Sequence, residues 1–334
     1  MTPVVSVKTI AVGLCAGLAS AILVISPVGG TALAVPLTLV IGLPLVIASL
    51  GWGAPAAIIA VLAGVGALAA ASPLLALDFA VFFAPPAVIG SHMLGLSRRI
   101  VADMSQPAPA GSAVEWYPLG RIAVLVAGAV VAGAVVMAIA HGFNPSDLTP
   151  EQIDRLTEAY ATAVEAVGDQ GTRPTKEDLQ PALRELVPAM MSALPFVFCA
   201  VWTVVALANL YLGAWITAQS SRLARPWEDV AAFEPPRWVF GLFLAAAATT
   251  AMEGTAGSIA AALAGALAVV LILVGLAVVH TITRGWPVRV GLLAAIYVFV
   301  GLFALPLLLL GIAELFLRLR MRARRRALAR RGPD

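Results

Sequence analysis

Charged residues are scarce in this sequence. Asp, Glu, Lys and Arg make up 12% of the 334 residues, whereas 61% are hydrophobic; a soluble domain carries roughly 25% charged residues. This deficit excludes a soluble globular protein. The apolar residues come in runs of helical length instead of the short alternations of a membrane barrel. We therefore expect an all-α fold, a polytopic transmembrane helical bundle of about 8–10 segments with a short amphipathic helical external insertion.

Residues suited to catalysis or metal binding are also few. The three histidines, His92, His141 and His280, fall on different predicted segments, and Cys15 and Cys199 lie inside apolar runs, where a free thiol behaves as a small hydrophobe. The sequence contains no disulfide framework, metal-ligand spacing, phosphate-binding loop or hydrolase motif. We expect neither an enzyme of a familiar class nor a cofactor or metal ion. An intramembrane enzyme of an unfamiliar type is left open.

Lysine is nearly absent, and the basic residues are unevenly distributed. Eight of the 21 basic residues are arginines between Arg318 and Arg331. Basic loops of inner-membrane proteins face the cytoplasm, so the sequence predicts a multi-pass protein of the bacterial inner membrane with residues 318–334 as a basic cytoplasmic tail. We expect this tail to contact anionic lipids. Contact with nucleic acid is the less favoured alternative.

The N-terminal region imitates a secretory signal. Lys8 precedes an apolar run from Ile10 to Ile25, and Ala32-Leu33-Ala34 fits a cleavage site. A signal peptide is normally followed by a soluble chain, whereas more apolar runs follow here. An uncleaved first helix is therefore the preferred interpretation.

The stretch from Leu43 to Pro55 sets the pattern of the chain. A proline-broken apolar run turns on Gly51-Trp52-Gly53 and enters another apolar run, which predicts a hinge between two membrane segments. We expect a six-segment bundle in residues 1–217 and additional membrane helices in residues 218–317. The expected first group is residues 7–25, a second segment ending at 50, residues 54–71, residues 73–96, a fifth segment ending near 141, and residues 189–217. Prolines are expected to bend or divide the second segment at Pro36 and Pro44, to break the fourth at Pro85-Pro86 and to interrupt the sixth at Pro195. The later segments are residues 239–252, 256–279 and 290–317.

Residues 142–188 form one sizeable polar insertion, with nine acidic against four basic residues. We expect it on the external face. Thr149-Pro150-Glu151-Gln152 combines an N-cap, a proline at the first helical position and a capping-box glutamine. A second pattern of helical spacing begins at Thr175. The insertion is therefore predicted to form two short amphipathic helices.

The last apolar block, from Val290 to Leu317, creates a topological conflict. A straight ninth span would place the arginine tail outside, against the tendency of basic segments to stay in the cytoplasm. The block is 28 residues long, and Pro306 lies near its middle. We favour a bend or re-entrant hairpin near Pro306 that keeps the tail inside. The straight span is the alternative.

Ionisable residues inside the apolar runs are candidates for function, because a charge in hydrocarbon costs several kcal/mol. Asp78 lies in the outer part of the fourth segment, and Phe82 and Phe83 follow it; a carboxylate beside aromatic rings suits a cationic or heteroaromatic ligand. His92 lies near the same face if the helix is straight. These four residues form the predicted ligand-binding set, with contact to interfacial water as the alternative for Asp78 and His92. Asn209 is interpreted as a hydrogen-bonding residue between helices.

Small residues recur at fourfold spacing in the first segment, which lets another backbone approach closely. One row consists of Ala11, Cys15 and Ala19, and the other of Gly13, Gly17 and Ala21.

The order of elements resembles that of a known group of membrane proteins. Residues 8–217 resemble the S components of energy-coupling-factor vitamin transporters. The resemblance lies in the Gly13–Ala21 row, the 26–31 loop, Leu43-Pro44, the 51–55 hinge and the 85–90 break. In addition, Ala193-Leu194-Pro195-Phe196 resembles the start of the last helix of these proteins. Over its whole length, with residues 275–280 and 310–314 and the arginine run, the chain resembles the YybS-like family of bacterial membrane proteins.

The resemblance to S components implies a pocket that opens to the outer side and is gated by the 26–31 loop. It also implies a first helix that docks on a membrane protein partner driven by ATPase subunits. The residues expected to dock are Ala11, Gly13, Cys15, Gly17 and Ala19.

Our leading hypothesis is a membrane protein that binds or transports a vitamin-like small molecule from the outer side. It rests on Asp78 and on the proline-broken segments, because broken backbone at membrane depth usually lines protein or a cavity. The alternative is a non-transporting scaffold that recruits partner proteins or anionic lipids.

Overall fold

The computed structural model describes residues 6–26, 34–99, 114–143, 149–167 and 176–329. Eight helical segments in these ranges are long and apolar enough to cross a membrane, which confirms the expected all-α polytopic bundle. The elements are α1 (Val7–Ile25), α2 (Ala34–Thr38), α3 (Leu43–Trp52), α4 (Ala54–Ala71), α5 (Pro73–Asp78), the π-helix η2 (Phe79–Phe83), α6 (Ala84–Gly95), β1 (Ser97–Arg99), β2 (Val114–Trp116), α7 (Leu119–Ala140), α8 (Pro150–Val167), α9 (Lys176–Gln219), the 3₁₀ turn η3 (Val230–Ala232), α10 (Trp238–Thr249), α11 (Gly254–Ile282), α12 (Arg289–Val298), α13 (Val300–Leu317) and α14 (Leu319–Ala329).

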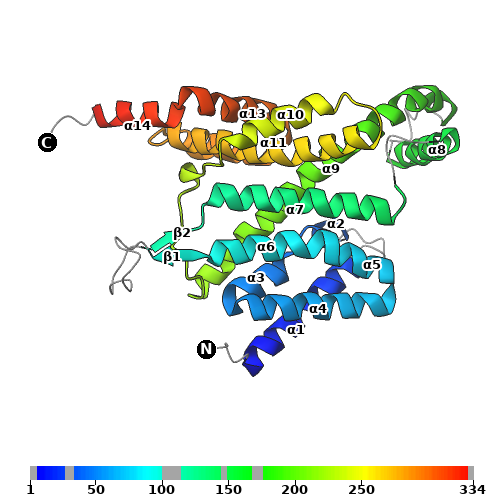
Figure 1. Cartoon of the computed structure of the whole chain (residues 1–334). Coiled ribbons are helices and arrows are strands. Elements are labelled where there is room, and N and C mark those ends of the chain that lie inside the picture. The colour runs from blue at the N-terminus through cyan, green and yellow to red at the C-terminus, as the bar shows by residue number, and fades with distance from the viewer. Residues whose placement is uncertain (1–5, 27–33, 100–113, 144–148, 168–175, 330–334) are drawn as a thin grey trace.

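The helices pack in two groups that share α7 and α9 (Figure 1). The first helix group contains α1 and α3 to α6, and its core includes Leu45 and Phe79. The second helix group contains α10, α11 and α13, and its core includes Val130 and Leu271. The long helix α9 slants across both groups in Figure 1. One helix therefore ties the N-terminal and C-terminal parts of the chain together.

Glycine and proline divide the second and third segments where the sequence predicts. Gly53 has φ +82°, a conformation that favours glycine, and it separates α3 from α4. Pro44 and Pro55 lie in the first turns of α3 and α4, where a missing N–H costs nothing. Residues 39–42 form a turn between α2 and α3. The predicted division of the second segment and the hinge at Gly51-Trp52-Gly53 are therefore confirmed.

The fourth segment differs from the expected break at Pro85-Pro86. Residues 73–95 are continuously helical, and the irregularity lies one turn earlier, in the π-helix Phe79–Phe83. Both prolines sit in the first turn of α6 directly after this π-helix. The wider π-helical turn accommodates the two residues that lack N–H groups, so the helix continues instead of breaking.

The polar insertion is helical, as predicted, but its second helix is not separate. At the start of α8 the Thr149 N–H donates to Gln152 Oε1 at 2.8 Å and the Gln152 N–H donates to Thr149 Oγ1 at 3.3 Å, which is the predicted capping box. The second predicted helix runs without interruption into the sixth membrane segment as α9. Pro181, Pro188 and Pro195 all lie inside α9, so the predicted interruption at Pro195 is wrong.

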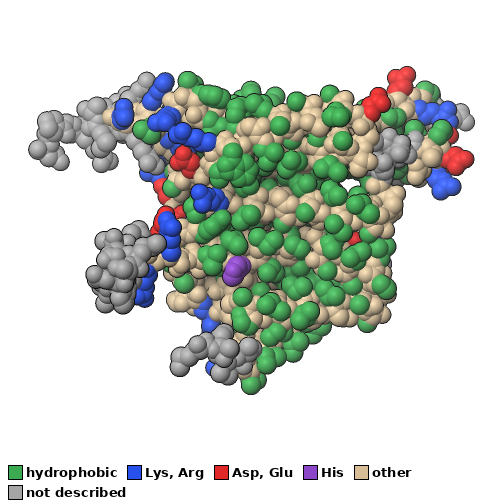
Figure 2. Space-filling model, viewed as in Figure 1, with side chains coloured by type: hydrophobic (Ala, Val, Ile, Leu, Met, Phe, Trp, Pro, Cys, Tyr) green, Lys and Arg blue, Asp and Glu red, His purple; other side chains and the backbone are tan. Residues whose placement is uncertain are grey.

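Basic side chains gather at the end of the bundle that carries β1, β2 and α14, here called the basic end (Figure 2). The other end carries α8 and most of the visible acidic groups and is called the opposite end. Arg225 at the basic end donates to the Tyr117 carbonyl at 2.7 Å, and Arg284 pairs with Asp229. The β1–β2 hairpin there, in which Arg98 pairs with Glu115, was not predicted.

The last apolar block folds back to the basic end. α12 and α13 meet at Phe299, and Arg320 of α14 donates to the Ala231 and Phe233 carbonyls at 3.1 and 2.9 Å. The tail helix therefore lies at the same end as Arg284. The predicted hairpin is present, but its turn is at Phe299, because Pro306 is accommodated inside α13.

Helices α1 and α4 pack at backbone contact. A Cβ atom added at Gly17 would lie 2.2 Å from the Ala60 carbonyl oxygen, and one added at Gly13 would lie 2.8 Å from that of Ala56. The glycine row thus serves packing inside the chain. Ala11 and Cys15 of the other row are exposed, so docking of a partner through Ala11, Cys15 and Ala19 stays a prediction.

We expect Gly17→Ala to destabilise the protein by about 1–3 kcal/mol, because the added methyl group must push α1 away from α4. Gly66→Ala on α4 is the matched control, since no atom lies within 4 Å of the added Cβ; it should be neutral or stabilising by up to about 1 kcal/mol. Thermal unfolding in detergent measures both. Equal melting temperatures for the two variants would contradict the close α1–α4 contact.

The position of the tail helix predicts a labelling pattern. In a chain with Cys15 and Cys199 replaced by alanine, single cysteines are placed at Ser220, Arg322 and Thr162, which are all exposed. A membrane-impermeant maleimide added to intact cells should label the Thr162→Cys chain and spare the other two. Labelling of Arg322→Cys together with Thr162→Cys would instead show a straight ninth span.

Candidate functional site

A small cavity lies between the α2–α3 turn, η2 with α6, α7 and α9. Its volume is about 30 Å³, enough for about one or two water molecules. None of the described residues that line it is ionisable. The lining residues are Thr38, Leu39, Ile41, Gly42, Phe82, Phe83, Pro86, Ala87, Val130, Trp202, Val205, Ala206 and Asn209.

Asn209 provides the polar group of this cavity. Its Nδ2 donates to the Leu39 carbonyl at 2.7 Å and to the Val205 carbonyl at 2.8 Å. Both bonds require the NH₂ group on that side, so the orientation of the amide is fixed. The residue is 6% exposed, and its Oδ1 has no hydrogen-bond partner among the described residues. The predicted long-range bond of Asn209 is present, but its acceptor lies in the α2–α3 turn and not in a helix, and a buried acceptor is left over.

Aromatic rings form one wall of the cavity. Phe82 and Phe83 of η2 meet Trp202 of α9 edge-on, each with ring centroids 5.3 Å apart. Phe198 stacks on Phe82 at the same centroid distance. Edge-to-face packing fixes the rings and presents their apolar surfaces to the cavity.

The π-helix positions these rings through two close contacts. A Cβ atom at Gly64 of α4 would lie 2.5 Å from the Phe79 ring, and one at Gly133 of α7 would lie 2.3 Å from the Val81 carbonyl oxygen. Helices α4 and α7 therefore both pack closely against η2. The extra residue of a π turn changes the direction in which the following side chains point. Phe82 and Phe83, at the end of this π-helix, line the cavity.

Asp78 lies outside the cavity, one turn before Phe82. The Nε2 of His141 lies 2.9 Å from its Oδ1 and 3.0 Å from its Oδ2. The side chain of Asp78 is 13% exposed and that of His141 is 37% exposed. The pair joins the end of α5 to the end of α7 at the opposite end of the bundle. Asp78 and His141 both lie near ends of predicted membrane segments. This shared position is what the sequence offered to suggest that they pair.

The predicted ligand set is therefore divided. Phe82 and Phe83 line the cavity, Asp78 pairs with His141, and His92 is exposed in the last turn of α6. The structure brings Asn209 and Trp202 to the phenylalanines instead. No group of three or more His, Cys, Asp and Glu side chains that could hold a metal ion occurs in the described part of the chain.

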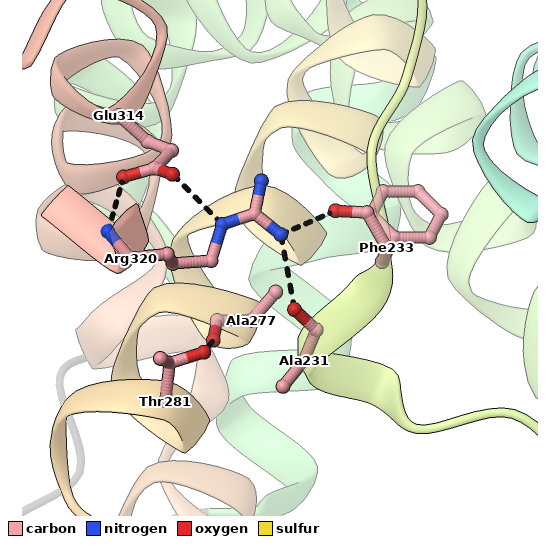
Figure 3. Close-up of polar contacts among 6 residues, drawn as sticks. All are labelled: Ala231, Phe233, Ala277, Thr281, Glu314 and Arg320. Carbon is pink, nitrogen blue, oxygen red and sulfur yellow. Dashed lines mark hydrogen bonds and ion pairs between the residues drawn. The ribbon is translucent and has the colours of Figure 1, made fainter. Parts of the chain in front are cut away.

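A buried ion pair closes the basic end of the second helix group (Figure 3). Arg320 Nε donates to Glu314 Oε1 at 2.8 Å, and the Arg320 backbone N–H donates to Oε2 at 3.1 Å. The two side chains are 11% and 8% exposed. Because Arg320 Nη1 also donates to carbonyls of the η3 region, the Glu314 carboxylate has its partner and α14 is held against η3.

We expect Arg320→Gln to destabilise the protein by about 3–5 kcal/mol, because it leaves the buried Glu314 carboxylate without its partner. Arg98→Gln is the matched control at the same end, where the ion pair with Glu115 is exposed, and it should cost less than about 1 kcal/mol. Thermal unfolding in detergent compares the two variants. Glu314→Gln combined with Arg320→Gln should recover part of the loss, and a similar small loss for both single variants would argue against the junction.

The fold and the apolar segments define a polytopic helical membrane protein. The chain belongs to the family described as Predicted membrane protein (DUF2232), whose model matches residues 18–315. No curated protein and no solved structure matches the chain. The matched residues lie in both helix groups.

Proposed function

We propose that this protein binds a small, uncharged molecule in the cavity at Asn209, and that binding or transporting this molecule is its function. The observation that carries the proposal is the unpaired Oδ1 of Asn209. A buried acceptor without a donor costs about 1–3 kcal/mol, and the amide cannot turn without breaking its bonds to Leu39 and Val205. A bound molecule that donates a hydrogen bond would satisfy this oxygen. The proposal contains no catalytic step.

The lining indicates the chemistry of the ligand. Phe82, Phe83 and Trp202 offer flat apolar surfaces, which suit a planar or aromatic group. The described lining has no ionisable side chain, so a net charge on the ligand would be unpaired. We therefore propose a neutral planar molecule with one N–H or O–H donor. This replaces the cationic ligand that Asp78 suggests, because His141 already engages that carboxylate.

Entry of a ligand requires movement of the α2–α3 turn. The cavity of about 30 Å³ is smaller than any vitamin-like molecule. One backbone hydrogen bond of the turn is long, with the Ile41 N–H donating to the Thr38 carbonyl at 3.5 Å, and the Asn209 bond to the Leu39 carbonyl would have to open as well. α2 has five residues, and Val35 within it is 71% exposed. Opening from the outer side, as the resemblance to S components implies, belongs to this proposal; the 26–31 loop lies largely outside the described residues.

We expect Ala206→Phe to abolish ligand retention, because the added ring fills the cavity from α9. Ala208→Phe is the matched control: the same substitution two residues away on an exposed position of the same helix. Native mass spectrometry of the purified chain in mild detergent should show a bound small molecule in the wild type and in Ala208→Phe, and none in Ala206→Phe. Asn209→Leu should weaken retention by roughly 10-fold, the value of one hydrogen bond to a buried acceptor.

Equal retention by Ala206→Phe and Ala208→Phe would place the molecule elsewhere and defeat the proposal. A wild-type chain that arrives empty but with reproducible protein partners would favour the scaffold alternative. The first surface to test is then the row Ala11, Cys15 and Ala19, in which Ala11 and Cys15 are exposed.

A further inference from the structure

A second and larger hollow opens at the basic end, separate from the cavity at Asn209. It lies between the η3 region, the start of α10 and the junction of α13 with α14, and its volume is about 320 Å³. Val274 and Leu315 contribute apolar lining, and three arginines line it: Arg237, Arg318 and Arg320. A space of this size admits a phosphate group together with the atoms attached to it.

The three arginines differ in what they bind. Arg320 is engaged by Glu314 and by two backbone carbonyls (Figure 3). Arg237 and Arg318 are exposed, and their guanidinium groups have no hydrogen-bond or ion-pair partner among the described residues. Arg320 therefore builds the junction, and the other two guanidinium groups are available to a ligand.

The backbone holds Arg318 at this position. Its φ of +47° and ψ of 50° are left-handed, and it forms the corner between α13 and α14. This conformation costs a residue with a side chain about 1–2 kcal/mol. The Glu314–Arg320 pair spans the corner and stabilises it. The junction thus keeps Arg318 at the edge of the hollow, beside the start of α10 that carries Arg237.

The charges of the hollow suit one negative group. Three arginines face two glutamates, Glu234 and Glu314, and Arg320 already compensates Glu314. The remaining balance is two arginines against Glu234, which leaves one positive charge. A phosphodiester carries one negative charge, and guanidinium groups bind its oxygens with paired N–H donors.

Exposed aromatic residues are close in sequence to the two available arginines. Trp238 follows Arg237 and is 58% exposed, and Phe316 lies two residues before Arg318 and is 68% exposed. Phe316 packs edge-on against Phe240 with ring centroids 5.5 Å apart. Exposed aromatic residues beside arginines are typical of the membrane interface, where a lipid headgroup passes into its acyl chains.

We propose that Arg237 and Arg318 form a binding site for the phosphodiester of an anionic phospholipid, whose acyl chains lie along the exposed faces of α10 and α13. The site is more specific than a general attraction of the arginine tail to lipids, because one of its arginines comes from another segment. It does not depend on the ligand proposed for the cavity at Asn209.

The test is titration of the delipidated full-length chain in detergent with phosphatidylglycerol or phosphatidylcholine, with native mass spectrometry counting lipid adducts. Arg237→Gln combined with Arg318→Gln should weaken phosphatidylglycerol binding by about 30-fold, since each arginine at an anionic surface contributes roughly a factor of 5. Arg121→Gln combined with Arg322→Gln is the control of equal charge: both arginines are exposed, and neither lines the hollow. This control should keep the binding of the wild type.

Arg237→Lys combined with Arg318→Lys should retain most of the binding, which separates loss of charge from loss of fold. Equal loss in the two glutamine pairs would overturn the site, because charge alone would then explain binding. Displacement of the lipid by excess inorganic phosphate would overturn the lipid assignment in favour of a soluble anion. Equal affinity for phosphatidylcholine would overturn the requirement for a net negative charge.

Discussion

A helix that breaks inside a membrane releases backbone carbonyls that must find donors, and the first helix group depends on how this need is met. The turn between α2 and α3 leaves the Leu39 and Ile41 carbonyls without helical partners. Asn209 Nδ2 donates to the first at 2.7 Å, and Ser20 Oγ donates to the second at 2.9 Å. Helices α1 and α9 are thereby fixed to the same turn. The cavity lies beside this turn. Because the NH₂ group of Asn209 faces the turn as a donor, its Oδ1 is left without a partner among the described residues.

The sequence predicts most of the helices because hydropathy and helix-ending residues act locally. The bounds of α1 and α4 agree with the expected 7–25 and 54–71. Prolines were less informative. Pro195 and Pro306 lie inside helices, because neighbouring helices can satisfy the carbonyl that a proline leaves free. The break at Phe299 has no proline or glycine at its centre, so it depends on packing of α12 and α13 against α11 and not on a local signal.

The candidate site was predictable in part. Phe82 and Phe83 follow Asp78 in sequence, and the aromatic wall is where that pattern suggests. The partners were not predictable, because His141 lies 63 residues from Asp78 and Leu39 lies 170 residues from Asn209. Hydropathy gives no information on which segments are neighbours. A π-helix further changes the phase of the residues that follow it, which separates His92 from the face that a straight helix assigns to it.

The two ends of the bundle are held together differently, and this bears on the direction of access. At the basic end, Arg225 binds the Tyr117 carbonyl, and Arg222 lies over the Trp52 ring at 4.3 Å. The segment that follows α9 is therefore fixed to the hinge before α4 and to the segment before α7. At the opposite end, a hydrogen bond between His141 and Asp78 joins the end of α7 to the end of α5. The α2–α3 turn is held by the Asn209 and Ser20 bonds and has no arginine anchor among the contacts described. Opening at the opposite end would leave the arginine contacts of the basic end intact, which favours the proposed entry of a ligand from the side facing away from the arginines.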